Sequence, residues 1–276
     1  MPTQTFCDKK NAGDLMPPSL CGLTALLLLL LAAPPSVCGQ AARWPDEYQV
    51  GQFLCHADFP LMPYRPLLDS MPTLERDLIQ ALALRPSREP IYVFLFHTKQ
   101  TYQSYLRQYF PDAPSRQALF IKDRGLGMIF AHVGDAFELD LRHECTHALL
   151  NAILPVTPLW LDEGLAEYFE VAAEERAGGN PHGKYVKFSA YLGQIPGLEE
   201  LEQLRDVSQM TRTRYRHAWA WVHFLLHGPP EAREELRRFL ADLQALTPPG
   251  LLSRRLRQRL PDLDARFAEH CRKWKL

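Results

Sequence analysis

The sequence predicts an α+β fold with a small mixed or antiparallel sheet and a central helix in a front lobe, about residues 40–154. A mostly helical C-terminal lobe is expected to follow, about residues 155–276. The front half mixes strand-like and helical patterns, whereas apolar residues in the back half recur almost entirely at helical spacing. The chain has 276 residues, 46% of them apolar, and no internal repeat or low-complexity linker. We therefore expect one domain with two lobes and a substantial core.

The first 39 residues have the composition of a signal peptide. Two lysines precede an apolar run from Leu23 to Ala33, which is too short to span a bilayer. We expect cleavage near Gly39 and export to the periplasm, the cell envelope or the medium, with no stable membrane span in the mature chain. Lipid anchoring at Cys38 is the alternative, but the three residues before it make a poor lipid-attachment motif.

The net charge bears on whether the protein binds nucleic acid, and the cysteines bear on which disulfide bonds can form. The net charge is −1, which argues against a nucleic-acid partner, and the Arg-rich stretch 254–259 is expected to be a solvated helix face. Once the leader is removed, Cys55, Cys145 and Cys271 remain, and three cysteines cannot all pair within one chain. Helical spacing predicts that Cys145 is a buried core thiol. A disulfide between Cys55 and Cys271 is a hypothesis.

Ahead of the central helix, the front lobe is predicted to contain two helices and three strands. The first helix is amphipathic and ends before a proline, and the first strand is a run of β-branched and aromatic residues. The second helix is also closed by a proline, and the last two strands are joined across a Gly-rich turn. The predicted elements are helix 67–84, strand 91–96, helix 101–110, strand 118–121 and strand 128–133.

The most informative stretch is the HExxH pattern formed by His143, Glu144 and His147. On an α-helix, residues four apart lie on one face, so both imidazoles can reach one metal ion, while the glutamate is placed to handle a metal-bound water. Asp135 and Glu138 form a capping-box pattern that predicts the start of this helix, and a proline after residue 154 predicts its end.

A second helix is predicted a few residues later, with Thr157 as its N-cap and a proline in its first turn. Helix rise places Glu163 roughly 8 Å along this helix, level with His147 if the two helices fold back on each other. Two histidines and one glutamate leave a fourth tetrahedral position open, as in catalytic zinc sites. Glu167 lies on the same face, and either it accepts a hydrogen bond from a ligating histidine or it is a solvated carboxylate.

The motif 143–147, followed by Trp-Leu-Asp-Glu-Gly-Leu-Ala-Glu-Tyr-Phe at 160–169, resembles the gluzincin pattern. More narrowly, it resembles an uncharacterised exported bacterial group of the peptidase-MA-like superfamily, over about residues 93–226. The resemblance implies a zincin-like fold and a zinc metallopeptidase, with His143, His147 and Glu163 as ligands of one zinc ion. It also implies that Glu144 is the general base.

The resemblance has implications for the substrate site too. It implies that strand 128–133 is a sheet edge along which an extended peptide pairs, and His132 on this strand is expected to be a surface residue. Nothing in the chain resembles the motif with which the large aminopeptidases grip a free N-terminus. The distance in sequence from His147 to Glu163 is also shorter than in those enzymes, so an aminopeptidase is disfavoured.

An oxyanion formed during hydrolysis needs a donor opposite the metal, and the predicted helix 211–227 offers Tyr215, His217 and His223. We favour Tyr215, because related gluzincins use a tyrosine from a downstream helix. The alternative is that Tyr215 belongs to an apolar stripe at helical spacing, and His223 is expected to be a core histidine. The predicted helices 231–246 and 262–274 have apolar faces that indicate a structural role.

The expected function is hydrolysis of a peptide or protein substrate by an exported zinc metallopeptidase. One alternative is a catalytically silent protein in which zinc only clamps two helices, although a silent site would not need Glu144. The other is a hydrolase that acts on amide bonds of cell-wall material.

Overall fold

The computed structural model describes residues 44–178, 180–195 and 197–274. Residues from Trp44 onward form one compact unit. The predicted signal peptide, its cleavage site and Cys38 lie outside the described residues. Within the described residues, no helix has both the length and the apolar character needed to cross a membrane.

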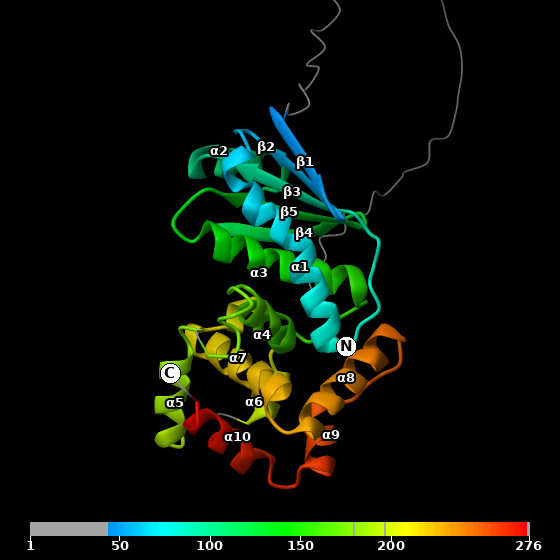
Figure 1. Ribbon diagram of the computed structural model, residues 1–276, viewed down its shortest axis with the longest axis vertical. Helices are drawn as coiled ribbons and strands as arrows, with labels where there is room; N and C mark the ends of the chain where they lie inside the picture. The colour runs from blue at the N-terminus through cyan, green and yellow to red at the C-terminus, as the bar shows by residue number, and fades with distance from the viewer. Residues whose placement is uncertain (1–43, 179, 196, 275–276) are drawn as a thin grey trace, which may run out of the picture. The chain divides into compact units, whose positions relative to one another are not determined.

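A five-stranded sheet confirms the α+β prediction (Figure 1). The strands are β1 (Asp46–Val50), β2 (Phe53–Ala57), β3 (Ile91–Phe96), β4 (Ala118–Asp123) and β5 (Leu126–His132). The last three lie close to their predicted positions. β1 and β2 are not among the predicted strands, because each has only five residues and β1 is mostly polar, which leaves little periodicity to detect.

The strand order is β1-β2-β3-β5-β4, so β1 and β4 form the two edges. β2, β3 and β5 run parallel to one another, and each edge strand is antiparallel to its neighbour. The prediction that strand 128–133 is a sheet edge is therefore wrong, because β5 pairs on both sides. Its residues 129–132 are buried on both faces, as expected of an interior strand. The edge next to it is β4.

Helices cover both faces of the sheet. α1 (Arg65–Leu82) and α3 (Phe137–Ile153) pack on one face, where Ile129 and Ala131 of β5 belong to the same apolar core as these helices. α2 (Lys99–Tyr109) packs on the other face, against Phe130. Because side chains alternate between the two faces of β5, this strand packs against helices on both sides of the sheet. A short turn connects the end of β5 to α3.

The helix starts near the HExxH motif differ from the prediction. The N-cap of α3 is Ala136 and no side chain caps this end, so the predicted capping box of Asp135 and Glu138 is wrong. Asp135 lies one residue ahead of the N-cap position. α4 (Leu159–Phe169) likewise begins after Pro158 without a side-chain cap, so Thr157 is not its N-cap.

The C-terminal lobe is helical, as predicted. After α4 it contains α5 (Gly183–Tyr191), α6 (Leu198–Glu202), α7 (Arg212–His227), α8 (Pro230–Gln244), α9 (Leu252–Arg259) and α10 (Leu263–Arg272). α4 packs closely along α7 at Gly164, where an added Cβ would lie 2.7 Å from the carbonyl oxygen of Ala218. A glycine is therefore required at this crossing, and it lies directly after the predicted metal ligand Glu163.

The three cysteines of the described residues are all free and buried. Cys145 is fully buried in α3, which confirms its prediction as a core thiol. Cys55 lies in β2 and Cys271 in α10, so the hypothesis of a disulfide between them is wrong. Burial raises the pKa of both thiols to about 12, which keeps them protonated and unreactive at neutral pH.

Candidate metal centre

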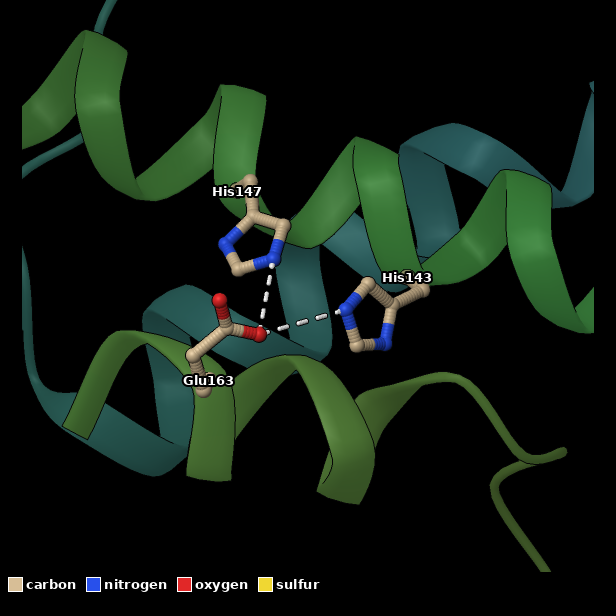
Figure 2. Close-up of side chains that lie close together, drawn as sticks. All are labelled: His143, His147 and Glu163. Atoms are coloured by element: carbon tan, nitrogen blue, oxygen red, sulfur yellow. Dashed lines mark ion pairs between the residues drawn. The ribbon is translucent and has the colours of Figure 1, made fainter. Parts of the chain in front are cut away.

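Two antiparallel neighbours, α3 and α4, bring His143, His147 and Glu163 together (Figure 2). One carboxylate oxygen of Glu163 lies 3.6 Å from Nε2 of His143 and 3.5 Å from Nε2 of His147. The i, i+4 spacing puts both rings on the same side of α3. Glu163 is next to Gly164, where α4 packs closely against α7. The three predicted ligands thus form a cluster that can hold a metal ion.

Each imidazole is oriented by a carboxylate on its outer nitrogen. Nδ1 of His143 lies 2.9 Å from a carboxylate oxygen of Glu170, and Nδ1 of His147 lies 2.9 Å from one of Asp162. When Nδ1–H donates to the carboxylate, Nε2 is left with a lone pair for a metal. These two carboxylates are not among the residues predicted for the site. Asp162 directly precedes the ligand Glu163, and Glu170 lies two helical turns after it, so the spacing contained a usable signal.

Glu167 has neither of the two roles considered for it. Its carboxylate lies 2.6 Å from Nε2 of His182, and it is mostly buried. The side chain therefore pairs with His182 and links the segment after α4 to that helix, although its carboxylate also lies within 4.8 Å of a ring nitrogen of His143. A second group of metal-capable atoms, His143 with Glu167 and Glu170, shares its histidine with the first.

The geometry of the cluster fits a tetrahedral divalent cation. Oε2 of Glu163 is buried and has no hydrogen-bond partner among the described residues. Hydrogen-bonded N and O atoms would lie about 2.9 Å apart, whereas ligand atoms around a tetrahedral zinc ion lie about 3.4 Å apart. The observed separations of 3.5 and 3.6 Å are closer to the second arrangement. The oxygen of Glu163 and the two imidazole nitrogens therefore form a group that could hold a metal ion.

The electrostatics of the cluster also favour positive charge. Burial lowers the pKa of His143, but its interactions with Glu163 and Glu170 outweigh burial and raise the pKa to about 10. The pKa of His147 is raised for the corresponding reason, by Asp162 and Glu163. Burial raises the pKa of Glu163, but the neighbouring imidazoles lower it well below its usual range. Without a metal, protons on the imidazoles balance the carboxylates, and a divalent cation replaces them.

Glu144 follows His143 in α3 and is only 7% exposed. It does not belong to the metal-capable cluster of the described residues. Its charge acts on Tyr102 of α2, whose pKa is raised to about 12 by burial and by Glu144. Glu144 is therefore positioned beside the ligands without being one of them, as a general base requires.

Of the three oxyanion candidates, Tyr215 is the one on whose pKa the charge of Glu163 acts. It is half-buried in the first turn of α7, and its pKa is raised by burial and by the charge of Glu163. Tyr215 also packs against the main apolar core, so the two alternatives for this residue are compatible. Arg116, in the segment before β4, contacts its phenol and opposes the rise in pKa.

The two histidine candidates have other surroundings. His223 is a satisfied core histidine, as expected, with Nδ1 2.9 Å from Nε2 of His270 and Nε2 3.1 Å from the carbonyl oxygen of Ala177. His217 borders a cavity of about 470 Å³ with Thr211, Thr213 and Arg214, which contains none of the metal ligands. Burial, with the charge of Arg216, lowers the pKa of His217 to about 4.

His132 is buried, so the prediction of a surface residue is wrong. It is the last residue of the interior strand β5, and Tyr102 of α2 covers it at a ring-centroid distance of 5.3 Å. Nδ1 lies 3.0 Å from the carbonyl oxygen of Val133, and Nε2 has no partner among the described residues. Strand alternation alone could not show that a helix on the far face covers this position.

No family model matches the chain, and no curated protein matches it. The case for a metal centre therefore rests on the residues and their geometry.

Proposed function

We propose that the protein is an exported zinc-dependent metalloprotease that hydrolyses peptide bonds. The observation that carries the proposal is the buried Glu163 oxygen, which makes no hydrogen bond to a described residue and lies 3.6 and 3.5 Å from the Nε2 atoms of His143 and His147. Two imidazoles and one carboxylate are a donor set that zinc accepts, and they leave a position open for water or substrate. The buried Glu144 beside them distinguishes a hydrolytic site from a structural zinc clamp.

The residues divide the chemistry among themselves. Zinc, when bound by the three ligands, lowers the pKa of a water molecule and polarises the carbonyl of the substrate. Glu144 accepts the proton of the attacking water and returns it to the leaving amine. Tyr215 donates its phenolic hydrogen to the developing oxyanion, and its raised pKa keeps it protonated at neutral pH.

The free edge of β4 supports a protein or peptide substrate. β4 pairs with β5 on one side, and no described strand pairs with it on the other. An extended peptide can add to such an edge through main-chain hydrogen bonds. β4 is therefore the strand with which we expect an extended peptide to pair, in place of the predicted strand 128–133.

The decisive test compares the zinc-loaded wild type with Glu144→Gln on a peptide library read by mass spectrometry. We expect the variant to keep its zinc and to lose at least about a hundredfold in kcat/KM, because general base catalysis contributes ~10²–10⁴-fold. Glu138→Gln is the matched control on the same helix, since Glu138 is exposed and pairs only with Arg142.

Equal cleavage by wild type and Glu144→Gln would contradict the mechanism. Stoichiometric zinc without cleavage of any peptide by the wild type would favour the silent zinc clamp instead. Turnover of cell-wall fragments alone would identify the amide hydrolase.

A further inference from the structure

The free edge of β4 has a defined direction relative to the metal centre. β4 runs antiparallel to β5, and Ala118 at its start pairs with Ala131 near the end of β5. The chain passes from the end of β5 into α3, which carries the ligands and Glu144. The start of β4 is therefore the end of this edge strand nearest the start of α3.

This direction determines which part of a bound peptide reaches the start of β4. Antiparallel pairing is the more stable arrangement per residue, and it places the C-terminal part of an added strand beside the start of its partner. A peptide that pairs antiparallel with β4 thus presents the residues after the scissile bond to the segment just before Ala118. Arg116 lies in that segment.

Arg116 is a half-buried cation that forms no ion pair with a described residue. The groups on which it acts are the phenols of Tyr215 and Tyr102. The charges of Glu163 and Glu144 act on the same two phenols, so Arg116 shares its neighbours with the candidate metal centre. By contrast, the buried Arg176 is paired with Asp77 at 2.8 Å. Arg116 thus contacts a phenol but no carboxylate of the described residues, and a bidentate anion matches the geometry of a guanidinium.

We propose that Arg116 recognises a substrate carboxylate on the C-terminal side of the scissile bond. The carboxylate is either the free C-terminus of the peptide or an acidic side chain, which would distinguish release of a C-terminal fragment from internal cleavage. This inference rests on the proposed function, because it assigns specificity to the same site.

The test uses the zinc-loaded full chain and three versions of one peptide that the wild type cleaves. The first version ends in a free carboxylate, the second is amidated, and the third is amidated with a Glu in place of a Gln just after the scissile bond. We expect the wild type to prefer the first or the third over the second by about tenfold or more, as for charge-assisted hydrogen bonds. Which of the two is preferred identifies the source of the carboxylate.

Arg116→Gln should bring the kcat/KM ratio of the preferred peptide to the neutral peptide to within about twofold of one. Arg116→Lys should restore part of the preference, because it keeps the charge but not the bidentate geometry. Arg212→Gln, an exposed residue at the start of α7, is the control and should change none of the three values.

Two results would overturn the inference while leaving the proposed function intact. One is a wild type that cleaves all three peptides equally. The other is an Arg116→Gln variant that loses the same factor on all three, which would make Arg116 a support for Tyr215. If the wild type cleaves nothing, the proposed function fails separately. Fluorescence polarisation with the three labelled peptides and zinc-loaded Glu144→Gln then tests recognition, and equal affinities would overturn it.

Discussion

At the scale of the residue, the metal centre depends on how each imidazole is oriented as much as on the three ligands. Glu170 and Asp162 hold the outer nitrogens of His143 and His147, and both are themselves largely buried or partly covered. An imidazole without such a partner rotates and exchanges tautomers, which weakens its affinity for a metal. Carboxylates that never touch the ion therefore contribute to its binding.

Glu170→Gln and Asp162→Asn should each weaken zinc binding by about 10–100-fold, measured by competition with a chromophoric chelator. Glu138→Gln is the control, because Glu138 lies on the helix of the two histidines but is exposed and pairs with Arg142. Its zinc affinity should stay within a few-fold of wild type. If the control lost as much affinity as the other two variants, the assigned hydrogen bonds would not be the cause.

The grouping of His143, His147 and Glu163 was predictable from sequence, whereas the carboxylate that supports His143 was not. The spacing of His143 and His147 on one helix face follows from helix geometry, and the short turn before α4 predicts the height of Glu163. Choosing between Glu167 and Glu170 as the partner of His143 requires the rotation of α4 relative to α3. That rotation is determined by tertiary packing, about which the two short sequence patterns contain no information.

At the scale of the element, Gly164 determines how closely α4 approaches α7. An added Cβ would lie 2.7 Å from the carbonyl oxygen of Ala218 and 2.9 Å from a methyl group of Val222. Because the helices cannot keep their separation with this atom between them, the substitution moves α4 and the ligand Glu163 next to Gly164. A substitution of Gly164 is therefore expected to change both the packing of α4 against α7 and the position of Glu163.

Gly164→Ala should lower the free energy of unfolding by ~1–3 kcal/mol, as overpacking does, and weaken zinc binding as well. Gly134→Ala is the control, since its added Cβ would meet His132 at an ordinary contact distance of 3.7 Å. Urea unfolding of the metal-free proteins measures the first effect. Unchanged stability of Gly164→Ala would show that the helices separate at little cost.

Element types were also easier to predict than element neighbours. The sequence pattern of residues 128–133 identified a strand correctly, but the place of β5 between β3 and β4 depends on long-range pairing. The edge assignment failed for that reason, and so did the exposure of His132, which α2 covers from the other face. The local sequence pattern predicts that a segment is a strand. Whether that strand lies at the edge of the sheet depends on its pairing with the other strands.

At the scale of the whole molecule, buried histidines join the C-terminal helix to the helix that carries Tyr215. His223 of α7 and His270 of α10 are hydrogen-bonded to each other, and Trp274 packs on His223 at a ring-centroid distance of 3.9 Å. Burial lowers the pKa of His223 to about 3 and that of His270 to about 4. In the unfolded chain both imidazoles would gain a proton at about pH 6.5. In the folded protein they stay neutral at that pH and gain a proton only in stronger acid.

This difference predicts a stability that falls in acid. The folded pKa values lie below the unfolded value of about 6.5, so the unfolded chain binds more protons as pH falls below 6.5 and the free energy of unfolding decreases until about pH 4. Comparing wild type with His223→Gln cancels the other titrating groups. The stability advantage of wild type at pH 7 should shrink by about 2 kcal/mol at pH 5, measured by urea unfolding. An advantage that is the same at both pH values would contradict the account.

Metal analysis combined with X-ray absorption tests whether two imidazoles and one carboxylate bind a zinc ion. We predict about one zinc per chain, with nitrogen and oxygen ligands at about 2.0–2.2 Å and no sulfur, and loss of the metal in Glu163→Ala. A metal-free protein after zinc loading, a sulfur ligand in the absorption spectrum, or full zinc retention by Glu163→Ala would contradict it.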